Sequence, residues 1–265
     1  MLGYVEVLKR LPAIVLFAVL MVVGLAVAVG LTVLSERAFD DGVRSRTSTS
    51  VTAVVGVIAG LYAVLIAFVI VNEWQSFEAA QADLSNESAA LASASFSAGV
   101  LPPAAHARVD AAIGGYARSV VCVELPFLAT HQGPAVKTRL ALRRLYSEVA
   151  AVAPAVRNHA FYESTVRSLE DVAQARRDRI NAASSPLPGL LLAVVAITSL
   201  GLVAAVSALD TQHRRWHLLI TVALTFMVAL NLVLIISLNR PFEGAAKISD
   251  APMREGVPAA LLRCD

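Results

Sequence analysis

Residues 47–72 read TSTSVTAVVGVIAGLYAVLIAFVIVN, a run of 26 residues without an acidic or basic side chain. A helix needs roughly 20 apolar residues to cross the hydrocarbon core of a bilayer, so this run predicts a transmembrane helix. Three more uncharged runs, at 11–35, 181–209 and 218–239, predict three further spans. The composition agrees, because 57% of the 265 residues are hydrophobic and only 16% are charged.

We therefore predict an all-α integral membrane protein in which two transmembrane helical hairpins flank a helical cytoplasmic domain. The hairpins cover 1–72 and 181–239, with turns at 36–47 and 210–217; the central domain covers 73–180 and a tail covers 240–265. A signal peptide is the alternative for the first run, since Lys9 and Arg10 precede it and it contains Ala26-Val27-Ala28. The apolar residues continue to Leu34, which favours a retained anchor.

Basic residues near the span ends predict the orientation. Four spans place both termini and the central domain on one side, and cytoplasmic segments carry an excess of Lys and Arg. That side has nine basic residues and the other side has five: Lys9, Arg10, Arg167, Arg176, Arg177, Arg179, Arg240, Lys247 and Arg254 against Arg37, Arg44, Arg46, Arg214 and Arg215. The termini and the central domain are thus predicted to be cytoplasmic.

The central domain is predicted to be helical. A stripe of Trp74, Phe77, Leu84 and Leu91 continues the second span as one helix from Val51 to Ala98, ending before Leu101-Pro102-Pro103. Further helices are expected at 105–124, halted by Pro126, and at 135–152 and 155–180.

Charge is segregated within this domain. Residues 73–98 hold four acids and no bases, Glu73, Glu78, Asp83 and Glu87, whereas residues 134–181 hold nine bases and five acids. We favour packing of these two segments against each other, so that their charges offset. The alternative places the acids, with Glu73 and Glu78 nearest the second span, around an oligomeric vestibule that attracts cations.

Several function classes find no support in the sequence. It has no catalytic motif, its net charge of +2 indicates no nucleic-acid surface, and no cofactor is predicted. His213 and His217 could share a metal, but their position beside Arg214, Arg215 and Trp216 favours interfacial anchoring. Cys122 and Cys264 lie 142 residues apart without a C-x-x-C motif, which supports neither a disulfide framework nor a zinc site.

The second span carries the candidate pore residues. Leu61, Leu65, Phe68 and Asn72 recur at helical spacing and, repeated around an axis, would form an apolar neck with a polar end. Contact with lipid or with the protein core is the alternative for this stripe. The spans lack ionisable residues, which disfavours a proton relay or a pump but allows a passive pore.

Two further polar or small features lie within the spans. Gly56 and Gly60 form a G-x-x-x-G motif that predicts close helix packing and would favour assembly. Asn231, near the middle of the fourth span, is expected to hydrogen-bond another helix or to face water.

A set of ordered motifs across residues 50–250 resembles the bacterial bestrophin-like family, catalogued as a domain of unknown function. The motifs are Gly60-Leu61-Tyr62, Ala67-Phe68, Trp74, Glu87, Leu101-Pro102, Tyr116, Glu124-Leu125-Pro126, Arg176-Arg177-Asp178-Arg179-Ile180, Leu187-Pro188 and Leu238-Asn239-Arg240-Pro241-Phe242-Glu243-Gly244. The chain departs from the family at Leu125, often Trp, and at Asn239, often Asp. The acidic calcium clasp of true bestrophins has no counterpart here.

The resemblance implies a function. Bestrophins are pentameric anion channels whose second span lines the pore, so it implies a homo-oligomer, a pentamer by resemblance, with Leu61, Leu65 and Phe68 as the neck. We predict a non-enzymatic passive channel, for anions, in a bacterial inner membrane, with the lipid bilayer, further copies of the chain and small ions as partners. The alternative is a non-conducting scaffold or signalling adaptor that binds a partner through its cytoplasmic helices.

Overall fold

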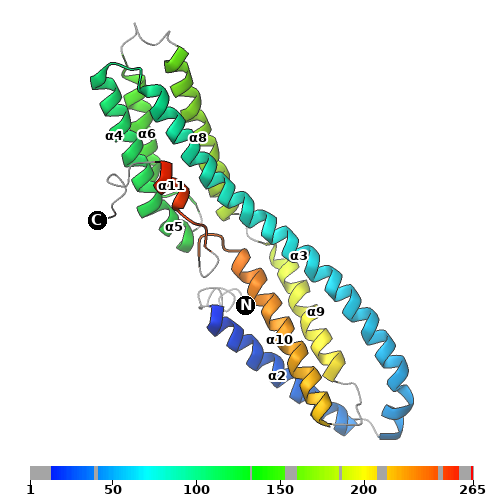
Figure 1. Ribbon diagram of the computed structural model, residues 1–265. Helices are drawn as coiled ribbons and strands as arrows, with labels where there is room; N and C mark the ends of the chain where they lie inside the picture. The colour runs from blue at the N-terminus through cyan, green and yellow to red at the C-terminus, as the bar shows by residue number, and fades with distance from the viewer. Residues whose placement is uncertain are drawn as a thin grey trace. The chain divides into compact units, whose positions relative to one another are not determined.

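The computed structural model describes residues 13–38, 41–131, 133–152, 160–184, 187–207, 214–243, 247–256 and 264. All regular elements in these ranges are helices, which confirms the predicted all-α class (Figure 1). The chain divides into two compact units. Unit 1 comprises residues 1–74 and 187–239, and unit 2 comprises residues 75–186 and 240–265.

Unit 1 contains the most apolar helices. They are α2 (Ala13–Ala38), the first part of α3 (Asp41–Ala98), α9 (Gly189–Ser207) and α10 (Arg214–Leu238). Tyr62 and Ile66 of α3 share a buried cluster with Leu202 of α9 and Ile235 of α10. The helices α2 and α10 also meet closely, because a Cβ built on Gly24 would lie 2.6 Å from the Thr225 methyl carbon.

Uncharged runs located these helices but misplaced some of their ends. Residues 181–209 do not form one helix: α8 (Ala160–Ser184) continues to Ser184, and α9 begins only at Gly189. Pro188 accounts for the new start, because proline disfavours helical backbone at the residue before it. The predicted turn at 36–47 is mostly helical, since α2 ends at Ala38 and α3 begins at Asp41.

Unit 2 is built from the second part of α3 and the helices that pack on it. These are α4 (Pro103–Ser119), the π-helical η1 (Val120–Glu124), α5 (Leu125–Thr130), α6 (Val136–Ala150), α8 and α11 (Ala251–Gly256). Leu84 and Leu91 of the predicted stripe are fully buried in its core with Tyr116 and Leu145, whereas Trp74 is half exposed.

Pro126 does not end the helical structure as predicted. After α4, the backbone widens into the π-turn of η1, in which Leu125 N–H donates to Val120 O, and continues as α5. Pro126 lies in the first turn of α5, where a missing N–H leaves no intrahelical bond unmade.

Cys122 and Cys264 form a disulfide, which the sequence did not predict. The C-terminal segment returns to unit 2 and places Ile248 and Met253 in its core. A separation of 142 residues in sequence carries no sign of that return.

Five helical segments in the described ranges are long and apolar enough to cross a membrane, one more than the four predicted spans. The additional segment, Pro103–Thr130, is half buried within the structure, against 11–28% for the other four. The number of spans therefore stays a prediction.

Candidate functional site

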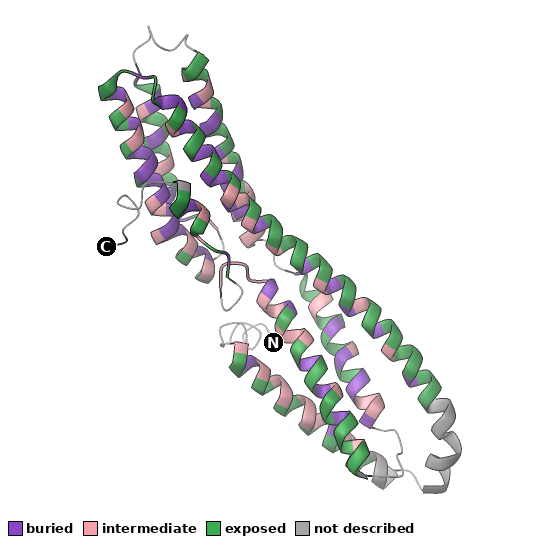
Figure 2. Cartoon of the chain, in the orientation of Figure 1, coloured by how far each residue is buried: buried purple, intermediate pink, exposed green. Residues whose placement is uncertain are grey.

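The part of α3 within unit 1 has one packed face and one open face (Figure 2). Tyr62, Ile66 and Val69 are buried against the cluster formed with α9 and α10. The Tyr62 hydroxyl lies 2.9 Å from Ser199 Oγ, so even the polar end of this buried side chain has a partner. One face of α3 is thus fixed to its own unit, and the other is left for lipid, water or a neighbouring subunit.

The predicted neck residues lie on or beside the open face. Leu61 is 68% exposed and Phe68 is 72% exposed, while Leu65 is half-buried beside the unit 1 cluster. Asn72 is exposed at the polar end of the same stripe. All four side chains come from one helix, so a closed apolar ring would need copies from several chains.

The two predicted vestibule acids differ in exposure. Glu78 is exposed, but Glu73 is only 4% exposed and accepts a side-chain hydrogen bond from Asn72. Seven residues separate Glu73 from the buried Ala80, which places both on the packed face of α3. Of these two acids, Glu78 is therefore the one that is open to solvent within a single chain.

The other features predicted within the spans find little packing inside one chain. A Cβ built on Gly56 or Gly60 would meet nothing within 4 Å, so the G-x-x-x-G motif makes no close contact within the described part of the chain. Asn231 is half-buried in α10. His213 lies outside the described residues, and no group of three metal-ligating side chains occurs in the ranges that the structure covers.

Unit 2 holds a buried cluster of charges that the sequence did not predict as a site. Arg179 of α8 donates from Nε to Glu87 Oε2 at 2.8 Å and from Nη2 to Glu124 Oε2 at 2.8 Å. Arg176 also donates to both carboxylate oxygens of Glu124, and the Tyr116 hydroxyl donates to Glu87. Two acids and two bases make the cluster neutral overall.

Burial makes this cluster sensitive to the loss of any member. The side chains of Arg179, Glu87 and Glu124 are completely buried, and that of Arg176 is 9% exposed. Burial alone would lower the pKa of Arg179, but the carboxylates of Glu87 and Glu124 outweigh it and raise that pKa above its ordinary value. The guanidinium therefore stays charged and connects α3, η1 and α8.

Part of this cluster follows from the predicted charge segregation. The Glu87–Arg179 ion pair confirms that the acidic segment packs on the basic segment, at least for one of the four acids. The signal that was missed is helical phase, since Glu87 lies three residues after Leu84 and four before Leu91, on the buried stripe. An acid in that position needs a buried cation.

Comparisons with known proteins agree with this architecture. A family model described as a Bestrophin-like domain matches residues 16–253. A solved variant of a bacterial bestrophin homologue from Klebsiella pneumoniae is 14% identical, with a TM-score of 0.71 over 91% of this chain and 97% of that chain. A second structure of this homologue, phased with zinc, has a TM-score of 0.69 at 14% identity, again over 91% and 97% of the two chains. No curated protein sequence gave a significant match.

Proposed function

This chain belongs to the Bestrophin-like family, and on that premise we propose that it is a homo-oligomeric membrane channel for the passive flow of small ions, with α3 lining the pathway. The observation that carries the proposal is the two-faced character of α3. Tyr62 and Ile66 fix one face to the core of unit 1, while Leu61 and Phe68 remain open on the other.

The proposed membrane-spanning segments are α2, the first part of α3, α9 and α10. The fifth apolar segment, Pro103–Thr130, is assigned to the extramembrane domain because half of it is buried within the structure. It also contains Glu124, whose carboxylate is held by Arg176 and Arg179 of α8. Charged side chains are costly inside a bilayer, so buried ion pairs with neighbouring helices favour a place for this segment outside the membrane.

We place unit 2 in the bacterial cytoplasm with both termini, on the excess of basic residues near that side of the spans. Arg176 and Arg179 no longer contribute to this argument, since both are committed to buried ion pairs. Seven basic residues then face five, in the same direction as before.

The chemistry of the open α3 face suits a passive pore. Apolar side chains at a constriction can control ion flow by excluding water, without any titrating group. Leu61, Leu65 and Phe68 would form such a neck, and Asn72 would supply polar contacts where it ends. Anions are the proposed ions, by resemblance to bestrophins, whereas the exposed Glu78 would favour cations if it lined the pathway.

Recording from the purified full-length chain in planar bilayers tests the proposal. Under a salt gradient we expect a current whose reversal potential has the sign of an anion pathway. Phe68→Ala should widen the neck and raise unitary conductance by about twofold or more. Ile197→Ala, a change on α9 at a side chain of similar exposure (69%), is the matched control and should leave conductance unaltered.

A silent bilayer with correctly assembled protein would reject the channel. Equal responses to Phe68→Ala and Ile197→Ala would instead reject α3 as the lining helix. A reversal potential of the opposite sign would retain the pore but overturn the proposed anion preference.

One observation favours the alternative, a non-conducting scaffold. Unit 2 has a groove of about 550 Å³ between α3 and α8, in which Phe96 is 82% exposed and Phe161 is 41% exposed. A partner helix could bury these rings. For a scaffold, Phe96→Ser would abolish partner capture, and the wild-type protein would carry no current.

A further inference from the structure

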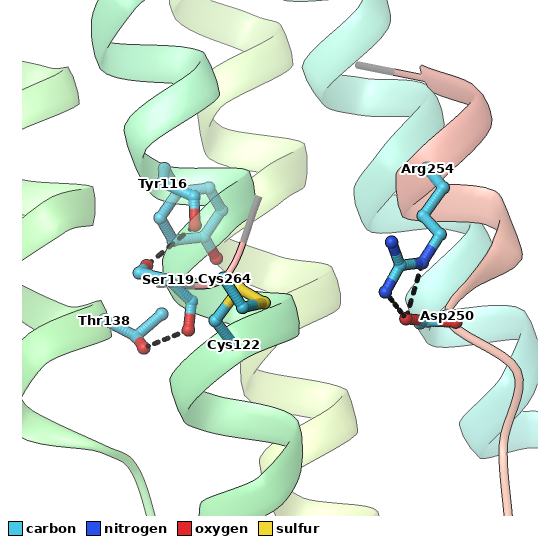
Figure 3. The surroundings of a disulfide bond; sticks show 7 residues. All are labelled: Tyr116, Ser119, Cys122, Thr138, Asp250, Arg254 and Cys264. Carbon is cyan, nitrogen blue, oxygen red and sulfur yellow. Dashed lines mark hydrogen bonds and ion pairs between the residues drawn. A yellow bond between two sulfur atoms is a disulfide. The ribbon is translucent and has the colours of Figure 1, made fainter. Parts of the chain in front are cut away.

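A disulfide joins Cys264, near the C-terminal end of the chain, to Cys122 of η1 (Figure 3). They are the only two cysteines in the sequence, and their Cα atoms lie 5.5 Å apart. Cys122 is half-buried in the π-turn of η1, whereas Cys264 is exposed. A small thiol in solution could therefore reach the bond from the Cys264 side.

The segment before Cys264, residues 247–256, lies along α3 and is called the strap here. In the described residues, three hydrogen bonds join it to α3: Ser249 N–H donates to Gln81 Oε1 at 2.9 Å, Gln81 Nε2 donates to Ser249 O at 3.3 Å, and Ser88 Oγ donates to Pro252 O at 2.6 Å. A fourth bond, from Ile248 N–H to Pro241 O at 2.7 Å, holds the start of the strap. Ile248 and Met253 add two buried apolar side chains. A short segment with four hydrogen bonds and two buried side chains opens more easily than the long helices of the core, so a covalent bond near its end adds to its hold on α3.

The residue of α3 that binds the strap and the cysteine of η1 both lie close in sequence to a member of the buried charge cluster. Ser88, which binds the strap, follows Glu87 directly, and Cys122 lies two residues before Glu124 in the same π-turn. Loss of the strap would therefore uncover α3 next to one carboxylate of the cluster. Release of Cys122 would remove a restraint next to the other.

We propose that the Cys122–Cys264 bond is a reversible latch that keeps the strap on α3 when oxidised and lets it detach when reduced. The proposal rests in one respect on the proposed function, namely on a cytoplasmic unit 2. Disulfides that persist are rare in the cytoplasm, and those found there are mostly transient or redox-sensing. An accessible bond between a core helix and a lightly held terminal segment fits that class.

The reaction is thiol–disulfide exchange with a dithiol reductant. A thiolate of the reductant attacks Cys264 Sγ, the bond between the two protein sulfurs breaks, and Cys122 leaves as a thiolate that takes up a proton. The second thiol of the reductant then displaces Cys264 from the mixed disulfide. The protein gains two electrons and two protons, and the dithiol becomes a disulfide.

Hydrogen exchange of the full-length chain in lipid nanodiscs tests the latch, with dithiothreitol as the reductant. We expect amides of the strap and of residues 81–88 to exchange about tenfold faster or more after reduction, and slowly again after reoxidation. Cys264→Ser should exchange at the fast rate whether or not dithiothreitol is present. Maleimide labelling should count two free thiols in the reduced chain and none in the oxidised chain.

A second variant keeps both cysteines and guards against misfolding of Cys264→Ser. Gln81→Ala removes the two bonds to Ser249, so it should speed strap exchange in the oxidised chain, where the strap is bound, and have less effect in the reduced chain, where the strap is already detached. Equal exchange in oxidised and reduced protein would overturn the proposal. So would a bond that stays fully oxidised in cells treated with dithiothreitol, because that bond would be a permanent cross-link.

The outcome is separable from that of the channel proposal. Exchange and thiol counts need no ion current, so a silent bilayer leaves the latch standing. A reporter fused to the C-terminus gives the orientation independently, and an extracytoplasmic reading would overturn both the proposed orientation and the latch while leaving conduction open.

Discussion

Arg179→Gln should lower the free energy of unfolding of unit 2 far more than a substitution at a nearby surface residue. The substitution removes the bonds from Arg179 to Glu87 and Glu124 while both carboxylates stay completely buried. Glu87 would keep the Tyr116 hydroxyl, and Glu124 would keep Arg176, so one negative charge would remain without a cation. Breaking a buried ion pair on one side costs about 3–5 kcal/mol.

Hydrogen exchange measures this cost without requiring reversible unfolding of the whole membrane protein. Since about 1.4 kcal/mol is a factor of ten, the protected amides of α8 and of the second part of α3 should exchange roughly a hundredfold to a few thousandfold faster. Arg177→Gln is the matched control, because Arg177 is the exposed neighbour of the buried Arg176 on α8. Its effect should stay within about 0.5 kcal/mol.

A companion double variant checks the electrostatic reasoning. Adding Glu87→Gln to Arg179→Gln leaves the neutral pair of Glu124 and Arg176, so part of the lost protection should return even though a second native side chain has been removed. If Arg179→Gln matched the Arg177→Gln control, or if Glu87→Gln only added to the damage, uncompensated buried charge would not be what holds this cluster together.

Two predictions concern the packing of unit 1. Gly24→Val should lower the melting temperature in detergent by several degrees, because its side chain would collide with Thr225 at a cost of about 1–3 kcal/mol. Gly30→Val is the control and should have little effect, because nothing lies within 4 Å of its Cβ position. Equal shifts in melting temperature would refute the close α2–α10 contact. Asn239→Leu should destabilise the start of α9 by about 1–2 kcal/mol, because Asn239 Oδ1 accepts the Leu187 N–H at 2.8 Å, whereas Asn239→Asp keeps an acceptor and should be near neutral. Faster amide exchange at the start of α9 would report the lost stability. Equal exchange in the Leu and Asp variants would contradict the role of this bond.

The same bond explains one departure from the family pattern noted in the sequence. Where Asp is frequent, this chain has Asn239, and the side-chain oxygen of either residue can accept a backbone N–H. The predicted hairpin brings the end of the fourth span near the start of the third, but the sequence does not show which side-chain oxygen meets which backbone N–H. Only the three-dimensional structure shows that these residues, 52 positions apart, form this bond.

Features set by the local sequence were predictable, and most contacts between residues far apart in the sequence were not. The missing charges located the apolar helices, and Leu101-Pro102-Pro103 located the end of α3 at Ala98. The disulfide was missed because a tail that refolds onto a distant helix leaves no periodic trace. Glu73 is an intermediate case: it lies seven positions before Ala80 of the predicted stripe and is buried within one chain, while its place in an oligomeric vestibule stays a prediction.

The phase of α3 limits what the rest of the helix can do. Its buried positions recur at three, four or seven residues from Tyr62 through Ala98, so one face is committed to packing in both units. Between residues 52 and 72, the open face carries Leu61 and Phe68 and no Asp, Glu, Lys or Arg, and one chain leaves these two side chains 68% and 72% exposed. Lipid can cover such a face, but so can the same face of another copy around a central axis. The second arrangement is the one proposed above, and Phe68→Ala distinguishes the two because a lipid-facing ring cannot set unitary conductance.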